Sequence, residues 1–198
     1  MTEKMEFKIN EIFYSLQGEG YFTGTPAVFV RFSGCNLKCP FCDTQHTEGV
    51  KMTTDEIIKE INRYPARHIV FTGGEPSLFI DETFVASIKE KTGKFIAIET
   101  NGTHSLPQNI DWITLSPKFE FCNDANLAIT ECNELKVVFR DQDLSIYDNI
   151  KAAHRFLQPC DCGNPNINKS IQKKAVQYCL EHPEWRLSLQ THKLLGIQ

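Results

Sequence analysis

Six short apolar runs, rich in β-branched and aromatic residues, constrain the fold of this chain more than any other feature. They cover 27–32, 68–72, 94–100, 111–116, 134–139 and 186–190. Between several of them, apolar residues recur at helical spacing: at 57, 58 and 61, at 84, 85 and 88, and at 171, 175, 176, 179 and 180. Strands that alternate with helices indicate βαβ units and a mostly parallel sheet.

The length of the chain limits how many such units it can contain. A closed (β/α)8 barrel takes roughly 250 residues, and this chain has 198. We therefore predict an α/β fold with an incomplete, TIM-like β/α barrel, in a single domain over 1–198. The turn-rich stretch 158–169 could be a linker, but the roughly thirty residues that follow are too few for a second domain.

Composition and charge argue against several classes of function. The formal charge of −4 is unlike the basic footprint of a nucleic-acid-binding protein, and no apolar run is long enough to span a bilayer. Charges interrupt the first thirteen residues, which is not typical of a signal peptide. Eight cysteines without a secretory signal indicate reduced thiols in the cytoplasm. We expect a cytoplasmic protein that binds neither nucleic acid nor membrane.

Three of the cysteines form a C-x3-C-x2-C stretch just after the first predicted strand. Cys35, Cys39 and Cys42 supply soft thiolates, which select zinc or iron–sulfur clusters. A structural zinc site closes with four ligands, and His46 could complete a Cys3His site. A [4Fe–4S] cluster with three cysteines instead leaves one iron open to a substrate or cofactor. The spacing favours the cluster and leaves zinc as the alternative.

Glycine, proline and polar residues follow four successive strands. The cysteine stretch follows the first, and "TGGEP" (72–76), "ETNGT" (99–103) and "SPK" (116–118) follow the next three. In α/β barrels the carboxyl ends of the strands form the face where active sites assemble. Each stretch alone would be an ordinary turn. Together they predict one active-site mouth.

These motifs resemble those of the radical S-adenosylmethionine superfamily, through the three cysteines with Phe41 before the third and through Gly-Gly-Glu-Pro after the second strand. The ordered set "SLQGEGYFTGTPAVFVRFSGCNLKCPFCDT", "TGGEPSL", "ETNGT", "SPK" and "SLQTHK" is similar to the 7-carboxy-7-deazaguanine synthase family. This resemblance runs from about Ile9 to the last residue. The set of motifs is far more specific than the cysteine spacing alone.

The resemblance implies a radical enzyme. The three cysteines would bind three irons of a [4Fe–4S] cluster, and S-adenosylmethionine would chelate the fourth. One electron would cleave this cofactor to a 5′-deoxyadenosyl radical, and 6-carboxy-5,6,7,8-tetrahydropterin would become 7-carboxy-7-deazaguanine with loss of ammonia, on the path to queuosine. The family also implies a lyase-type, homodimeric enzyme, reduced by a flavodoxin or ferredoxin, with Mg²⁺ held by Thr44.

The resemblance also assigns binding residues. Those for S-adenosylmethionine are Phe41, Cys42, Asp43, Gly73, Gly74, Glu75, Ser116, Pro117 and Lys118, with the Glu75 carboxylate expected to hold the cofactor's ammonium. Those for the pterin are Leu16, Gln17, Gly18, Arg31, Thr72 and Gln198. The guanidinium of Arg31 stands in an apolar strand and needs a partner. That partner is either a substrate carboxylate or an internal acid.

Two other functions remain open alternatives. One is a non-enzymatic zinc module, and the other is a radical activase that acts on a partner protein. An activase shares the cysteine loop but has no evident need for Thr44, Arg31 and "SLQGEG" together. The spacings of Cys122, Cys132, Cys160 and Cys162 match no cluster motif, so we predict that these cysteines are structural.

Overall fold

The computed structural model describes residues 5–198, and nine strands form a single sheet in the order β3-β1-β2-β4-β5-β6-β7-β8-β9. The strands are β1 Glu6–Leu16, β2 Pro26–Phe32, β3 Val50–Thr53, β4 His68–Gly73, β5 Phe95–Thr100, β6 Trp112–Leu115, β7 Glu131–Phe139, β8 Lys151–Pro159 and β9 Trp185–Leu187. Strand β1 pairs antiparallel with β2 and β3. From β2 to β9 every pairing is parallel.

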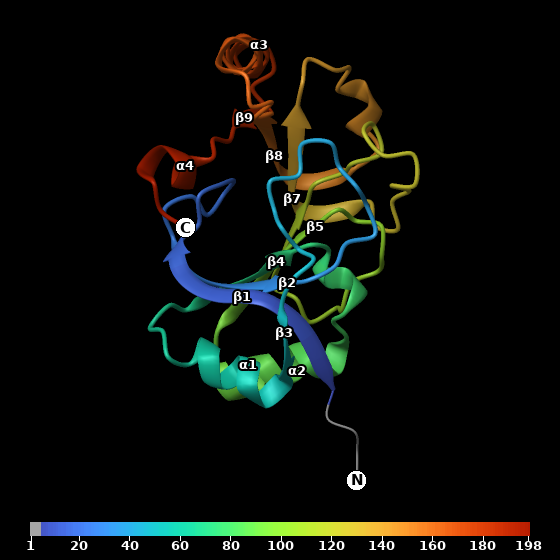
Figure 1. Ribbon diagram of the computed structural model, residues 1–198. Helices are drawn as coiled ribbons and strands as arrows, with labels where there is room; N and C mark the ends of the chain where they lie inside the picture. The colour runs from blue at the N-terminus through green and yellow to red at the C-terminus, as the bar shows by residue number, and fades with distance from the viewer. Residues whose placement is uncertain (1–4) are drawn as a thin grey trace.

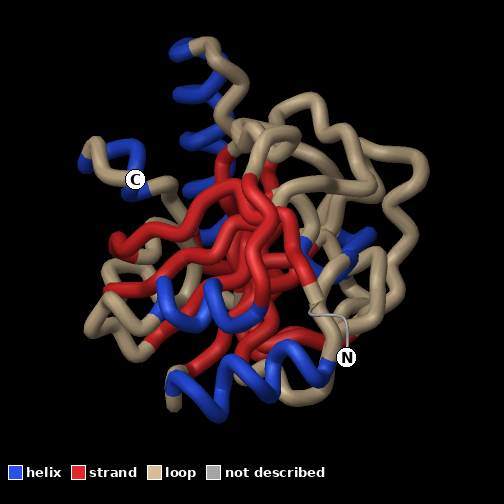
Figure 2. Tube along the Cα trace, turned by 60° about the horizontal axis from the view of Figure 1, so that its bottom comes forward, coloured by secondary structure: helices blue, strands red, loops and turns tan. Residues whose placement is uncertain are grey.

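The sheet curves but does not close, because β3 and β9 stay at its two edges within residues 5–198 (Figures 1 and 2). The α/β class and the incomplete barrel are thus confirmed. The first four residues of the predicted 1–198 domain lie outside the described residues, so that boundary stays a prediction. No helix within 5–198 has the length and apolar character needed to cross a bilayer.

The helices are α1 Thr54–Ile61, α2 Glu82–Thr92, α3 Pro165–Glu181 and α4 Thr191–Leu195, with short 3-10 turns at Pro76–Leu78 and Ser145–Tyr147. Helices α1 and α2 lie side by side at one end of the molecule, and α3 and α4 lie at the other (Figure 1). Thr53 and Glu56 form a capping box at the start of α1, which satisfies backbone donors of the first turn.

The helices bury the apolar residues that predicted them, with one exception. Helix α1 buries its three isoleucines, and α2 buries Phe84, Val85 and Ile88. In α3, however, only Ile171 and Ala175 are buried, while Val176 and Leu180 are 42% and 75% exposed. The predicted helix is confirmed, and it rests on the last strands along a narrow stripe.

The two faces of the sheet differ in the extent of their apolar packing, and the smaller cluster on the inner face leaves space for a site. On the outer face, Val28, Val30 and Phe32 pack against α1 and α2 in the main core. On the inner face, Ala27 and Phe29 meet only a small cluster with β4 and β5. Because side chains alternate along a strand, Arg31 follows Ala27 and Phe29 on this inner face.

All six predicted strands are confirmed within a few residues, and three further strands were missed. Strand β1 buries only Phe7 and Ile9, with charged Lys8 between them and polar Asn10 and Glu11 after them. Strand β8 begins with a polar, half-exposed stretch, and β3 has only four residues. The second half of the chain also uses few helices: loops or a single 3-10 turn connect β5 to β6, β6 to β7 and β7 to β8.

Candidate active site

The three cysteines lie in the loop between β2 and β3, and all three thiols are free. Gly34 N–H donates to the His46 carbonyl at 2.8 Å and closes this loop at its base. Cys35, Cys39 and Cys42 line a cavity of about 470 Å³, which we call the cofactor cavity. Burial raises the pKa of Cys39 to about 12, and the nearby Lys118 ammonium opposes this rise. Metal binding would therefore release protons from these thiols.

The arrangement of these thiols fits a cluster better than a single zinc ion. Within residues 5–198, no three Cys, His, Asp or Glu side chains converge as the ligands of one metal ion would. A zinc site requires such convergence, whereas a [4Fe–4S] cluster takes one thiolate per iron. Three thiols set around one cavity, next to the half-buried Lys118 ammonium, fit the cluster. The described residues do not form the alternative Cys3His site with His46.

The Gly-Gly step after β4 brings two loops into direct backbone contact. Gly74 N–H donates to the Phe32 carbonyl at 3.0 Å, and Glu75 N–H donates to the Gly34 carbonyl at 2.9 Å. A Cβ atom on Gly74 would lie 1.9 Å from the Gly34 carbonyl oxygen, which is backbone and cannot move aside easily. Gly73 has a φ of 121°, a conformation that favours glycine. Both glycines are needed to seat the cysteine loop.

The Glu75 carboxylate is 1% exposed and is held by protein donors. One of its oxygens accepts hydrogen bonds from Ser77 N–H, Ser77 Oγ and Thr100 Oγ1, and the other accepts one from Asn101 N–H at 2.7 Å. The carboxylate thus ties the end of β4 to the end of β5 beside the cofactor cavity. Its contact with an ammonium group of the cofactor stays a prediction.

The other predicted cofactor residues surround the same cavity, with one exception. Phe41, Asp43, Gly73, Gly74, Ser116 and Lys118 line it together with the cysteines and Glu75. Lys118 Nζ donates to the Ser116 carbonyl and hydroxyl oxygens, both at 2.6 Å, and burial lowers the pKa of Lys118. Pro117 is buried and is not among the lining residues.

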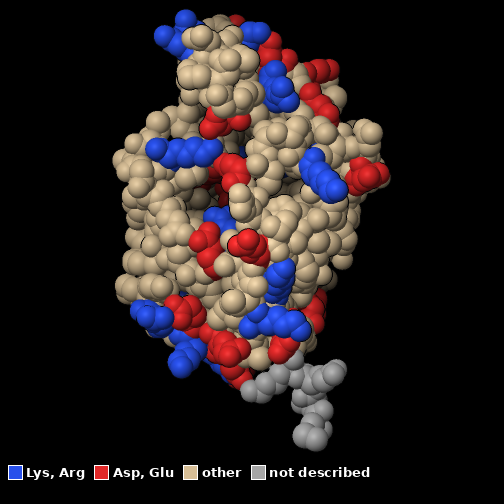
Figure 3. Space-filling model, viewed as in Figure 1, with Lys and Arg blue, Asp and Glu red and all other residues tan. Residues whose placement is uncertain are grey.

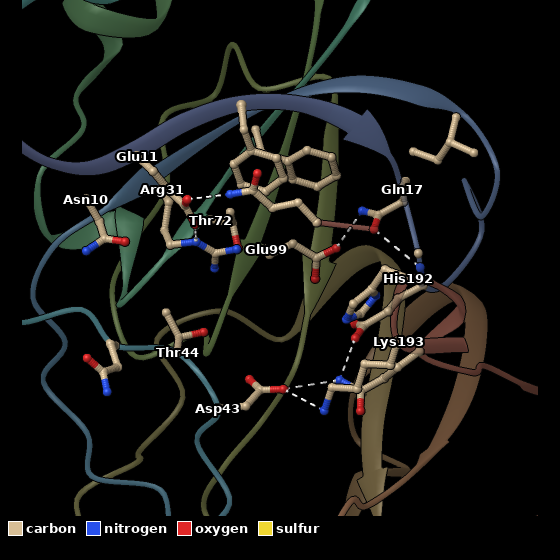
Figure 4. Close-up of a pocket in the computed structure, with 18 of the residues that line it drawn as sticks. Asn10, Glu11, Gln17, Arg31, Asp43, Thr44, Thr72, Glu99, His192 and Lys193 are labelled. Atoms are coloured by element: carbon tan, nitrogen blue, oxygen red, sulfur yellow. Dashed lines mark hydrogen bonds and ion pairs between the residues drawn. The ribbon is translucent and has the colours of Figure 1, made fainter. Parts of the chain in front are cut away.

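A second cavity of about 590 Å³ adjoins the first, and we call it the substrate cavity (Figures 3 and 4). Figure 3 shows acidic and basic side chains gathered around the hollow on this face. The predicted pterin-binding residues and the predicted magnesium ligand all line it: Leu16, Gln17, Gly18, Arg31, Thr72, Gln198 and Thr44. Sequence positions from 16 to 198 therefore meet in one place.

Arg31 has an internal partner and also faces the substrate cavity. Its Nε donates to Glu11 Oε1 at 2.8 Å, and its guanidinium lies 5.6 Å from the centre of the Phe13 ring. The two terminal nitrogens have no hydrogen-bond partner within residues 5–198, and Figure 4 shows the guanidinium directed toward Thr72. The ion pair fixes the side chain, and the outer edge of the guanidinium remains available to a carboxylate.

A buried ionic network at the boundary of the two cavities was missed in the sequence. Lys136 Nζ lies 2.7 Å from Glu19 Oε2 and 2.8 Å from Glu99 Oε2, and its side chain is only 8% exposed. Glu99 Oε1 also accepts a hydrogen bond from Gln17 Nε2 at 3.3 Å. All three charged residues line both cavities. Lys136 is a charged residue in an otherwise apolar strand, as Arg31 is. The same pattern could therefore have identified it in the sequence.

The charges of this network shift the pKa values of its carboxyl groups in opposite directions. Burial raises the pKa of Glu99 to about 7, with Glu134 and Glu19 adding to the rise and Lys136 opposing it. Burial would also raise the pKa of Glu19, but the Lys136 ammonium outweighs it and lowers the pKa to about 2. The wall between the cavities thus pairs a firmly ionised carboxylate with one that titrates near neutrality.

The stretch 158–169 is part of the site and not a linker. Gln158, Pro159, Cys160, Asp161 and Gly163 line the cofactor cavity. The residues Gln190 and Lys193 also line it. The positions in 158–169 were missed because turn-rich composition carries no signal for a cavity lining, whereas Gln190 and Lys193 belong to the motif "SLQTHK" but received no predicted role.

Two of the remaining cysteines lie close to the cofactor cavity. Cys122 Sγ is 3.8 Å from Cys39 Sγ, and Cys160 is buried in the wall of the cavity. Cys132 is buried in the second core cluster, against which Cys162 packs. Their predicted structural role stays a prediction, and Cys122 is the one placed to affect a cluster ligand.

Comparisons with known proteins agree with this site. The family profile of the Radical SAM superfamily matches residues 29–155. A 7-carboxy-7-deazaguanine synthase of Bacteroides thetaiotaomicron is 57% identical over 96% of this chain and 98% of its own length. The synthase of Haemophilus influenzae is 38% identical over 97% and 94%. The crystal structure of QueE from Escherichia coli superimposes with a TM-score of 0.76 at 30% identity, over 93% of this chain and 94% of that one.

The family profile covers the cysteine loop and the ends of β4, β5 and β6, and the relatives cover almost the whole chain. The chain therefore belongs to the 7-carboxy-7-deazaguanine synthase family of the radical S-adenosylmethionine superfamily.

Proposed function

We infer that this chain is a radical S-adenosylmethionine enzyme that converts 6-carboxy-5,6,7,8-tetrahydropterin to 7-carboxy-7-deazaguanine with loss of ammonia, in queuosine biosynthesis. Its curated relatives are named for the synthesis of this product. One structural observation supports the reaction most strongly: the cofactor and substrate cavities share seven lining residues, Glu19, Asp43, Thr72, Glu99, Lys136, Gln190 and Lys193. A bound pterin would therefore lie against the bound cofactor.

The bound cluster and S-adenosylmethionine supply the one-electron cleavage that starts the radical chemistry. The chain's own residues then bind and orient the pterin. The free edge of Arg31 matches a carboxylate in a bidentate manner, and the side-chain amide of Gln17, held by Glu99, can read a donor–acceptor edge of the ring. Glu99, whose pKa is raised, can hold or release a proton near neutral pH. The loss of ammonia requires such a proton transfer.

The first prediction concerns Arg31. Arg31→Lys keeps a positive charge but loses the fork that grips a carboxylate, so we expect the KM for the pterin to rise about tenfold or more with the cluster intact. The matched control is Arg63→Lys, at a guanidinium in the turn after α1 that pairs with Glu60 on the surface. Steady-state kinetics with varied pterin make the measurement. Equal KM values in both variants and the wild type would show that Arg31 serves only as the ion-pair partner of Glu11.

We propose further that Mg²⁺ binds beside Thr44, because this hydroxyl-bearing residue lines the substrate cavity next to the cysteine loop. Magnesium prefers oxygen ligands, retains several waters, and takes its other ligands from the substrate. Thr44→Ala should therefore weaken the Mg²⁺ dependence or the rate while sparing the cluster, and Thr44→Ser should retain part of the function. Turnover is measured against Mg²⁺ concentration for the three proteins. Three superimposable curves would make Thr44 an ordinary loop residue.

The finer features of the proposal rest on the family. We propose a carbon–nitrogen lyase type of reaction, a homodimer in the cytoplasm, and a flavodoxin or ferredoxin as reductant. A radical activase, the second candidate, would need a partner protein as substrate. Turnover of free 6-carboxy-5,6,7,8-tetrahydropterin by the purified enzyme, with no second protein except a reductant, would support the synthase. Consumption of S-adenosylmethionine only when a partner protein is added would support the activase.

A further inference from the structure

The chain's last residues, 190–198, border both cavities, and we call them the closing segment. Gln190 and Lys193 line both cavities, and His192 and Gln198 line the substrate cavity. Helix α4, within this segment, buries none of its residues, and Leu194 and Leu195 are largely exposed. Without buried apolar side chains, the segment depends on polar contacts for its position.

One set of these contacts joins the closing segment to the substrate side. The Thr191 backbone N–H and hydroxyl both donate to the Gly18 carbonyl, at 2.9 and 2.8 Å. Gln198 Nε2 donates to Glu11 Oε2 at 2.6 Å, and Gln190 Nε2 donates to Glu19 Oε1 at 3.1 Å. These acceptors belong to β1 and the turn that follows it, which form a wall of the substrate cavity.

A second set joins the closing segment to the cofactor side, and it centres on Lys193. Its Nζ lies 3.0 Å from Asp43 Oδ2 and 3.2 Å from Asp161 Oδ2. Asp43 belongs to the cysteine loop, Asp161 belongs to the turn after β8, and both line the cofactor cavity. Figure 4 shows Asp43 and Lys193 joined on the side of the cavity away from Arg31. One ammonium therefore links two loops that come from distant strands.

These ion pairs are suited to form and break during turnover. The three side chains are between 38% and 57% exposed, and each such pair contributes little to stability. If the closing segment moved away, both cavities would lose lining residues and the two aspartates would lose their shared cation. A ligand that contacts the segment in either cavity would favour the position that the structure shows.

We propose that Lys193 is a positioning residue that couples the two cavities, so that a pterin in the substrate cavity strengthens the binding of S-adenosylmethionine in the cofactor cavity. The pterin holds the closing segment in place, and Lys193 then holds Asp43 and Asp161 around the cofactor. By linkage, the cofactor strengthens pterin binding by the same factor. This inference rests on the proposed function.

The test measures binding without turnover. The holoenzyme is kept anaerobic with its cluster oxidised and no reductant, and the dissociation constant of S-adenosylmethionine is measured by calorimetry with and without saturating 6-carboxy-5,6,7,8-tetrahydropterin. We expect the pterin to tighten cofactor binding about fivefold in the wild type. In Lys193→Gln this factor should fall close to one, and Lys193→Arg should keep most of it. Asp161→Asn is an independent second variant that should also lower it.

Lys174→Gln is the matched control, because Lys174 forms a surface ion pair with Asp141 and lines neither cavity. It should leave the factor unchanged. Higher ionic strength should lower the factor in the wild type, because salt screens exposed ion pairs, and should not change it in Lys193→Gln. A wild-type factor of one, or an unchanged factor in Lys193→Gln, would overturn the coupling alone. No pterin binding by the wild type would overturn the proposed function and, with it, this inference.

Discussion

The Cys35→Ala variant is expected to lose most of its cluster iron and to cleave no S-adenosylmethionine. Each of the three cysteines would bind a different iron, so the loss of one thiolate leaves an iron without its protein ligand. Cys35 is a sharper choice than Cys39, because Cys122 Sγ lies only 3.8 Å from Cys39 Sγ and could take over its role. The measurements are iron content and the visible absorption of anaerobically reconstituted protein.

Two matched variants separate the cluster from its alternatives. Cys179→Ala removes a half-buried thiol of α3 and should retain full iron content. His46→Ala should also retain iron, whereas a Cys3His zinc site would lose its metal. Full iron retention in Cys35→Ala, or loss of the metal in His46→Ala, would contradict the assignment of the three-cysteine loop.

Lys136→Met is expected to cause the largest loss of stability among single substitutions near the site. It leaves Glu19 and Glu99 next to each other without the cation that binds both. Removal of one partner from a buried ion pair typically costs about 3–5 kcal/mol. Lys174→Met, at an exposed ion pair with Asp141, should change the free energy of unfolding by less than about 1 kcal/mol. Thermal unfolding of the holoenzymes under anaerobic conditions makes the comparison.

The loss of stability caused by Lys136→Met should also depend on pH, and the pKa values determine in which direction. The lowered pKa of Glu19 contributes stability above the unfolded pKa, and this stability disappears as the pH falls toward about 2. The raised pKa of Glu99 does the opposite: its contribution is lost as the pH rises through about 7. Without Lys136 both carboxyl pKa values rise, so ionisation becomes costly for both.

The difference in unfolding temperature between the wild type and Lys136→Met should therefore be larger at pH 8 than at pH 5. A difference that shrinks as the pH rises would show that Lys136 does not stabilise these carboxylates. A small difference in unfolding temperature at both pH 8 and pH 5 would show that the network is more solvated than its geometry indicates.

The sequence predicted the parallel part of the fold well, because strands buried on both faces are almost purely apolar. The run that became β4, for example, is buried over four consecutive residues. It failed for β1 and β8, whose faces are partly exposed or polar. In β1 the polar residues Asn10 and Glu11 line the substrate cavity. A strand such as β1 pairs antiparallel at the edge of the parallel array, and its alternating pattern is weaker than a continuous apolar run.

For the site, motifs located the residues near the ends of β2, β4, β5 and β6, since each motif directly follows an apolar strand. No motif or periodicity located Asp161, and the motif "SLQTHK" contains Lys193 without indicating its role. Their role depends on two turns far apart in sequence that meet only in the folded chain. Glu75 shows a different limit: its chemistry suggested a ligand, whereas its burial among four donors follows from the way β4 and β5 end side by side.

One measurement tests the central claim most directly: mass spectrometry of the products formed from 6-carboxy-5,6,7,8-tetrahydropterin by the reconstituted enzyme. The reaction is run anaerobically with a chemical reductant, Mg²⁺ and S-adenosylmethionine, and a parallel reaction omits S-adenosylmethionine. We expect a product that differs from the pterin by the loss of one ammonia, together with free ammonia, only in the complete reaction. Cleavage of S-adenosylmethionine with the pterin recovered unchanged would contradict the proposed function.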